Sequence, residues 1–194
     1  ANSGVINMGS MAVDGTFTLT PNSTGAVTIV NDAGLALAAS TMGGTFNGTA
    51  TTGNITQTGA LAITGTTTLT TSANDATITL GTDSNAFTGA ITITTNDASG
   101  TDADVTIDGG TTALVIAAST VDGDLALRTG NASGITDTGT VTVGGNFTAT
   151  TDANNGVITL DSMAVDGTFT LAPNNTGAVT IVNDAGLALA ASTM

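Results

Sequence analysis

The chain has 194 residues and a formal net charge of −14, because 15 acidic residues, all of them aspartate, face a single Lys or Arg, which is Arg128. A polyanion with one cation cannot neutralise a phosphate backbone, so nucleic acid and anionic membrane surfaces are excluded as partners. The absence of Cys and His removes disulfides, thiol nucleophiles, imidazole bases and the usual zinc ligands.

One short sequence word recurs along the chain: a Gly or Ala, followed by an alternation in which every second side chain is apolar. Such alternation predicts β-strands with one buried face, and the β-branched Thr, Val and Ile that fill it disfavour helix. Gly, Asn, Asp and Ser between the words are typical of tight turns. In chain order, the clearest copies are GALAI (59–63), ATITL (76–80), ADVTI (103–107), GDLAL (123–127), GTVTV (139–143), GVITL (156–160) and GAVTI (177–181).

A longer repeat contains these words. Residues 1–42 recur as residues 153–194, at an offset of 152 residues. A weaker similarity, at an offset of 80, relates residues 55–80 to residues 135–160. We therefore expect one continuous domain, residues 1–194, built from a 152-residue tandem unit that consists of two unequal half-units of four coils each.

Strand words separated by short turns predict an all-β fold, a right-handed parallel β-solenoid (β-helix), because one coil cannot bury its apolar row alone whereas stacked coils can. Eight words in 152 residues indicate about 19 residues per coil and about ten coils in the chain. With about 4.8 Å per coil, such a unit would advance about 38 Å. An antiparallel β-sandwich is the alternative for these strands, but it gives no reason for the sequence to restart after 152 residues.

The apolar positions of the words form the expected core. The differences between the two copies agree with this assignment, because Met8 and its counterpart Leu160 point inward and both are apolar, whereas Thr20 and its counterpart Ala172 point outward. The predicted core residues are Phe17, Leu19, Leu61, Ile63, Ile78, Leu80, Leu125, Leu127, Val141, Val143, Phe147, Ile158, Leu160 and Phe169.

Few side chains offer catalytic chemistry. Two pairs of carboxylates, Asp102 with Asp104 and Asp122 with Asp124, have the residue types of a β-helical polysaccharide hydrolase. Solvation of an acidic strand face explains such pairs more simply, and no Trp or Tyr offers a stacking platform for a sugar. We therefore expect that the chain is not an enzyme, and we assign no catalytic and no cofactor-binding residue.

Calcium is the one cofactor that the carboxylates suggest, because several of them lie near Gly-rich turns and Ca²⁺ prefers oxygen ligands. The spacing matches neither an EF-hand nor the nonapeptide calcium roll. The default expectation is therefore an acidic, solvated turn without a metal. The candidate calcium ligands are Asp102, Asp104, Asp108, Asp122 and Asp124.

The stretch GTVTVGGNFTATTDANNGVITL (139–160) resembles the rungs of filamentous-haemagglutinin-type adhesins and other giant bacterial surface proteins. The resemblance is one of repeat style and covers essentially the whole chain. It implies a secreted, rigid rod at the cell surface. The function it implies is structural, as a segment of a long extracellular filament or adhesin stalk, with roles in adhesion or biofilm.

Outward Thr-x-Thr segments, as in AITITT and TTTLTT, suggest an alternative function, an ice-binding β-solenoid. An ice-binding face needs this motif at the same station of every coil, whereas Ala, Asn, Asp and Gly interrupt it here. The open sheet edges at the ends of a solenoid invite pairing, so we expect self-association as a filament, end to end or laterally. We expect contacts with glycans or cell surfaces, and neither nucleic-acid binding nor membrane insertion.

Overall fold

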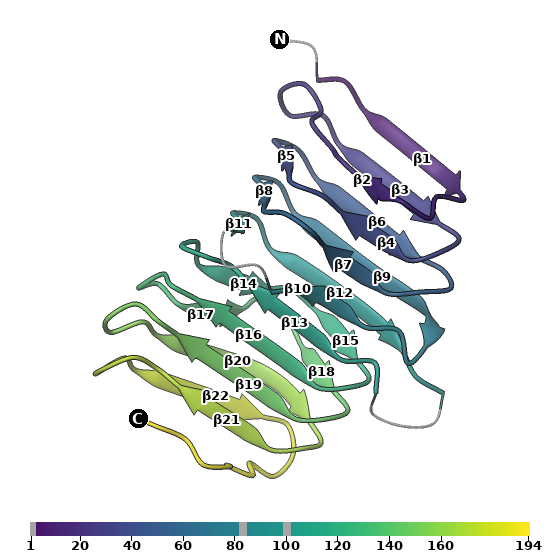
Figure 1. Ribbon diagram of the computed structural model, residues 1–194. Helices are drawn as coiled ribbons and strands as arrows, with labels where there is room; N and C mark the ends of the chain where they lie inside the picture. The colour runs from purple at the N-terminus through teal and green to yellow at the C-terminus, as the bar shows by residue number, and fades with distance from the viewer. Residues whose placement is uncertain (1–2, 82–84, 99–101) are drawn as a thin grey trace.

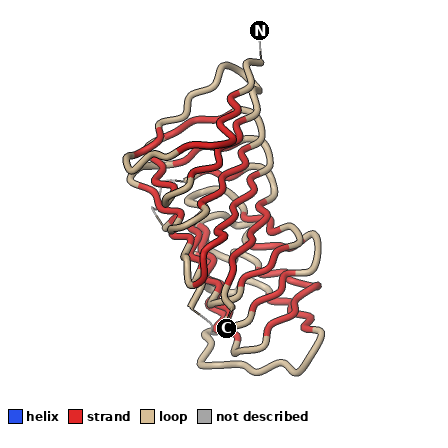
Figure 2. The backbone as a smooth tube through the Cα atoms, turned by 90° about the vertical axis from the view of Figure 1, so that its right-hand side faces the viewer, coloured by secondary structure: helices blue, strands red, loops and turns tan. Residues whose placement is uncertain are grey.

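The computed structural model describes residues 3–81, 85–98 and 102–194, and in it the chain winds into a parallel β-solenoid (Figure 1). The chain makes about eight turns that are spaced about 21 residues apart. Figure 2 shows the described chain as strands and loops stacked along one axis. Among the described residues, no helix is long and apolar enough to cross a membrane. The predicted all-β parallel solenoid is confirmed.

Three parallel sheets form the walls of the solenoid. Sheet A contains eleven strands, β1 (Ile6–Met11), β3 (Val27–Asn31), β6 (Phe46–Ala50), β9 (Thr67–Asn74), β12 (Ile91–Asn96), β14 (Leu114–Ile116), β15 (Ser119–Val121), β17 (Ile135–Asp137), β18 (Val141–Val143), β20 (Ile158–Val165) and β22 (Val179–Asn183). Sheet B contains eight strands, β2 (Thr16–Phe17), β4 (Leu35–Leu37), β7 (Ile55–Gln57), β10 (Ile78–Leu80), β13 (Val105–Asp108), β16 (Leu125–Thr129), β19 (Phe147–Thr151) and β21 (Phe169–Ala172). Sheet C contains three strands, β5 (Ser40–Met42), β8 (Leu61–Ile63) and β11 (Ala86–Phe87).

The number of turns in one repeat unit differs from the expectation. Strands β1 and β20 are equivalent under the 152-residue offset, and seven steps separate them in the order β1-β3-β6-β9-β12-β14-β17-β20. Seven steps also separate β2 from its equivalent β21 in sheet B. One unit therefore makes seven turns and not eight turns of 19 residues. At about 4.8 Å per turn, the unit advances about 34 Å.

The three sheets explain why eight words occupy seven turns. GALAI forms β8 in sheet C, GDLAL forms β16 in sheet B, and GTVTV forms β18 in sheet A. The same sequence word therefore lies in different sheets at different points of the chain. A word requires only that alternate side chains point inward, and every sheet satisfies that requirement. Counting words as coils therefore overestimates the turns by one per unit.

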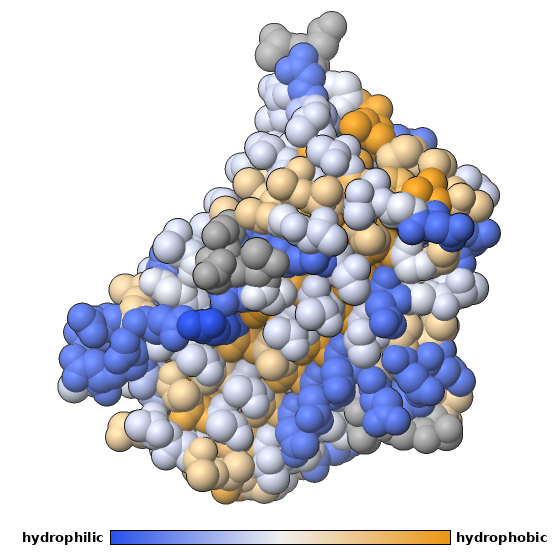
Figure 3. Space-filling model, in the orientation of Figure 1, coloured by the Kyte–Doolittle hydropathy of each residue, from blue (hydrophilic) through white to orange (hydrophobic). Residues whose placement is uncertain are grey.

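The interior of the tube is a continuous apolar core. All the residues expected in the core are buried, from Phe17 at 7% exposed to Phe147, Ile158 and Phe169 at 0%. Phe147 and Phe169 stack on successive turns in an edge-to-face arrangement, with ring centroids 5.7 Å apart. Figure 3 shows that the outer surface, by contrast, mixes hydrophilic and apolar residues over one face of the molecule.

Candidate functional site

A column of polar side chains follows the corner that leads into sheet B, one residue before each strand. The Oδ1 atom of Asp104 accepts the backbone N–H of Asp124 at 2.8 Å, and Asp124 Oδ1 accepts the backbone N–H of Asn146 at 2.6 Å. Asn146 Oδ1 in turn accepts the backbone N–H of Thr168 at 3.0 Å. Each of these side chains therefore accepts a hydrogen bond from the backbone of the next turn. The column links successive turns in this way.

The five candidate calcium ligands do not assemble into a metal site. Asp122 and Asp124 share the turn between β15 and β16, but Asp122 Oδ2 accepts the backbone N–H of Asp97 at 2.8 Å, one turn back. Asp108 is buried and its Oδ1 accepts the N–H of Gly110 at 2.7 Å, while Asp102 lies exposed. Within residues 3–81, 85–98 and 102–194, no three acidic side chains form a group that could hold a metal ion.

The lone cation of the sequence, Arg128, joins three successive turns on the outer face of sheet B. Its Nε atom lies 2.7 Å from Asp152 Oδ2, and its guanidinium lies 3.6 Å from Asp108 Oδ2. Asp108 is only 5% exposed, so this cation is the charge that balances a buried carboxylate. The arrangement borders a shallow hollow of about 230 Å³ whose other walls include Thr106, Ala126 and Thr148.

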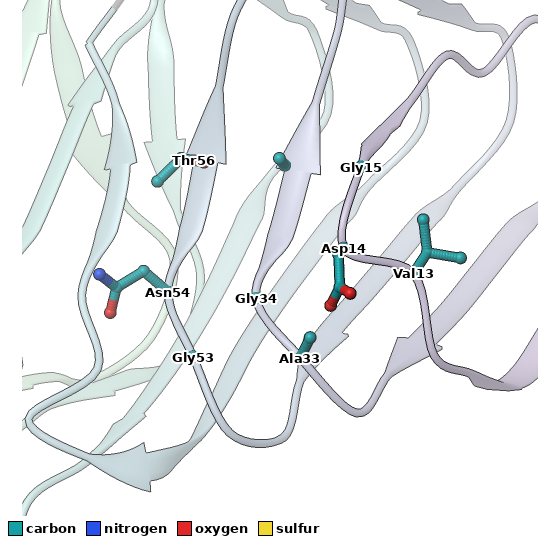
Figure 4. Close-up of a pocket in the computed structure, with 9 residues that line it drawn as sticks. Val13, Asp14, Gly15, Ala33, Gly34, Gly53, Asn54 and Thr56 are labelled. Atoms are coloured by element: carbon teal, nitrogen blue, oxygen red, sulfur yellow. The ribbon is translucent and has the colours of Figure 1, made fainter.

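A wider hollow of about 380 Å³ lies between sheets A and B at the first three turns (Figure 4). It exists because glycines leave its floor without side chains. Figure 4 shows Asp14 and Asn54 on opposite sides of this floor. The lining residues are Val13, Asp14, Gly15, Ala33, Gly34, Ala36, Gly53, Asn54 and Thr56. One carboxylate, one amide and one hydroxyl can form hydrogen bonds there, but a single titratable group supplies no acid–base pair.

Several residues form hydrogen bonds at the corners, which are the turns between one sheet and the next, and the sequence did not reveal this role. Ser40 Oγ accepts the N–H of Leu19 at 2.9 Å and donates to the carbonyl of Ala38 at 2.8 Å. Ser119 makes the same two bonds with Ile93 and Ala117, and Ser192 makes them with Leu171 and Ala190. The threefold recurrence of Ala-Ala-Ser-Thr was the available signal.

A buried asparagine locks a second type of corner. Asn31 is 0% exposed, and its side-chain amide accepts the N–H of Val13 at 2.9 Å and donates to the carbonyls of Val13 and Gly34. Its equivalent Asn183 forms the same set of bonds with Val165 and Gly186. The two equivalent asparagines, one in each copy of the repeated sequence, therefore form the same corner.

Threonines stack in columns on the outside of sheet A. One column places Thr49, Thr70, Thr94, Thr120 and Thr142 on five successive turns. Among the described residues of this sheet, Thr-x-Thr occurs side by side on only two adjacent turns, in β9 and β12. The regular two-column array that an ice-binding face requires is therefore confined to those two turns.

The pKa of Asp75 is shifted by its surroundings. Asp75 lies in a turn with a φ of 60°, close to Asp97 and Asp102. Desolvation, a hydrogen bond with Asp97 and the negative charges of Asp97 and Asp102 raise the pKa of Asp75 above its usual value. Asp75 itself lies in a solvent-exposed turn.

Comparison with known proteins identifies the type of repeat. The sequence model of a family described as repeats of unknown function (DUF5649) matches residues 24–94 and again residues 102–172. The chain belongs to this family. A search of curated proteins and a search of solved structures both found no match. The DUF5649 repeat accounts for the two related halves of the solenoid, and nothing in these comparisons points to the filamentous-haemagglutinin family.

Proposed function

We propose that this DUF5649 repeat chain is a structural segment of a long extracellular filament or adhesin stalk. Its role is mechanical: to extend, to space and to present a solvated surface. The observation that carries the proposal is that a 152-residue unit makes a whole number of turns, seven, in both sheet A and sheet B. Successive units would therefore continue the same walls without a break, as a rod requires.

The chemistry of the surface supports a passive rod. Carboxylates that sequence reasoning considered for catalysis or calcium cap backbone N–H groups of neighbouring turns instead. A cell-surface location, with contacts to glycans or to other filaments, fits a chain with one trypsin-type cleavage site at Arg128 and a net charge of −14. In this proposal the chain has no catalytic role and needs no cofactor.

The experiment that tests the proposal lengthens the chain by whole units. Appending one, two and three copies of residues 43–194 after Met194 continues the existing pattern. Negative-stain images should show rods whose length grows by about 34 Å per added unit while their width stays constant. Compact particles, or rods whose width grows with chain length, would contradict a filament role.

Ice binding is the second candidate, and the five-threonine column on sheet A is the observation that favours it. Threonine methyl and hydroxyl groups repeated at about 4.8 Å along a flat sheet form a regular surface. Thermal hysteresis of the purified chain tests this function directly. A hysteresis that Thr70→Lys and Thr94→Lys abolish would establish it and displace the filament proposal.

A further inference from the structure

The coil formed by residues 176–194 has a counterpart of identical sequence in residues 24–42, but only the first copy is covered by a further coil. The first copy contains β4 and β5, whereas the equivalent part of the second copy forms only an isolated bridge, Phe169–Leu189. In the first copy, Leu35, Leu37 and Met42 are all 0% exposed. In the second copy, the equivalent Leu187, Leu189 and Met194 are 49%, 51% and 71% exposed. The first copy is covered by the next coil, which contains β6, β7 and β8, whereas the second copy has an open edge.

The open edge already has the turn and the corners of the covered coil. Ser23 and its equivalent Asn175 both adopt a positive φ, 56° and 59°, in the turn that precedes the coil. The hydrogen bonds of Asn183 and Ser192 repeat those of Asn31 and Ser40, as described above. A covering coil would therefore meet preformed corners, and the ordering cost at these corners would be small.

Glycines make the covering coil specific. A Cβ atom at Gly44 would clash with the carbonyl oxygens of Thr24 and Gly25. A Cβ at Gly53 would lie 2.8 Å from the backbone nitrogen of Gly34, and one at Gly59 would lie 2.7 Å from that of Ala39. A coil that covers this surface must therefore lack side chains at three spaced positions.

The covering coil also supplies the hydrogen bonds of the edge. The backbone N–H groups of Val27, Leu35 and Ser40 donate to the carbonyls of Thr45, Asn54 and Ala60, at 2.8, 2.8 and 3.0 Å. The equivalent donors on the open edge belong to Val179, Leu187 and Ser192. These amides are reporters for whether a coil has docked.

We propose that the open edge of residues 176–194 is a docking surface for one occupant, a further copy of the repeat unit that enters with its coil equivalent to residues 43–63. The proposal deepens the proposed filament function, on which its biological setting rests, by naming the coil that continues the rod. The first coil of another intact molecule fits less well. Thr16, Ala36 and Thr56 occupy equivalent positions on successive turns, so Val13 of the first coil corresponds to Gly53. A side chain at that position would contact the backbone of the coil below.

The test compares three extensions of the full chain after Met194. The first appends the sequence of residues 43–63, the second appends the same sequence with G44V, G53V and G59V, and the third appends it with T49V, T56V and A62V. The third set adds the same number of valines at outward positions, so it controls for composition. Hydrogen exchange is measured at the amides of Val179, Leu187 and Ser192, with Val27, Leu35 and Ser40 of the same chain as references.

The proposal expects the first and third extensions to slow exchange at the three reporter amides by at least about tenfold, toward the reference amides, and the second to leave it unchanged. Equal protection by all three extensions would show that the edge accepts any strand and would overturn the assignment. No protection by the first extension, with the reference amides still protected, would also overturn it. Failure of the proposed filament function gives a different result from failure of this docking proposal. In that case the first extension would still protect the three reporter amides, but chains lengthened by whole units would not form rods.

Discussion

The two copies of the sequence TGAVTIVNDAGLALAASTM, residues 24–42 and 176–194, show what a neighbouring turn contributes to a β-solenoid. Both copies form the same corner hydrogen bonds with the turn that precedes them. Their burial differs, because Leu37 is 0% exposed and the equivalent Leu189 is 51% exposed. The preceding turn is therefore sufficient for the corner hydrogen bonds, whereas the dry core also requires the following turn.

The largest difference in stability between the two copies is expected when an apolar core residue is replaced by a charged one. Leu37→Asp should lower the free energy of unfolding by more than about 4 kcal/mol, because it buries an unpaired carboxylate. Leu189→Asp should cost at most about 1 kcal/mol, because its side chain already reaches solvent. Urea unfolding followed by circular dichroism measures both. Similar losses for the two variants would show that the second copy is covered in solution.

The corner asparagines give the next largest contrast. Asn31→Ala should cost about 2–3 kcal/mol, because it removes three hydrogen bonds of a fully buried side chain and leaves part-buried backbone groups of Val13 and Gly34 without these partners. Asn183→Ala should cost about 1 kcal/mol or less, because water can replace the amide at the open edge. The same urea titrations compare the two. A larger loss of stability for Asn183→Ala than for Asn31→Ala would contradict the idea that the covering coil makes the corner hydrogen bonds more important.

The serine corners provide a smaller contrast of the same kind. Ser40→Ala should cost about 1–2 kcal/mol, since its hydroxyl serves a buried N–H of the previous turn. Ser192→Ala should cost only a few tenths of a kcal/mol. Thermal unfolding of the two single variants and of the double variant checks both the size and the additivity of these effects. A cooperative loss in the double variant would indicate that the distant corners are coupled.

The smallest expected effect is a gain within the covered part of the solenoid. Thr67 points inward, is 1% exposed, and its Oγ1 atom has no hydrogen-bond partner. Thr67→Val keeps the shape and removes the buried hydroxyl, so it should raise stability by about 1 kcal/mol. Thr68→Val, on the outward side of the same strand, is the matched control and should be neutral. A loss of stability in the Thr67 variant would mean that this hydroxyl is satisfied in solution.

Much of the architecture could be predicted from the sequence because it depends on short-range alternation. The inward rows that contain Phe147 and Ile158 follow from a period of two, and parallel stacking follows from the restart of the sequence after 152 residues. The number of turns could not be predicted in this way. Words such as those of β8 and β18 are alike in sequence but lie in different sheets, so a word count does not count turns.

The side-chain roles were hidden for a different reason. The partner of Ser40 is 21 residues away and the partner of Asp104 is 20 residues away, so each bond exists only once the turns are stacked. Asp104 and Asp124 therefore have the appearance of exposed ligands in the sequence, whereas in the fold they cap the backbone of the following turn. The register that sets these partners is a property of the whole coil.

One 152-residue unit makes seven turns and returns to the same faces. Cryo-electron microscopy of a chain lengthened by several copies of residues 43–194 tests it most directly, because the turns between equivalent corners can be counted. We expect seven turns and an axial repeat of about 34 Å. Eight turns with a repeat of about 38 Å, or a repeat in which equivalent corners fall on different faces, would contradict it.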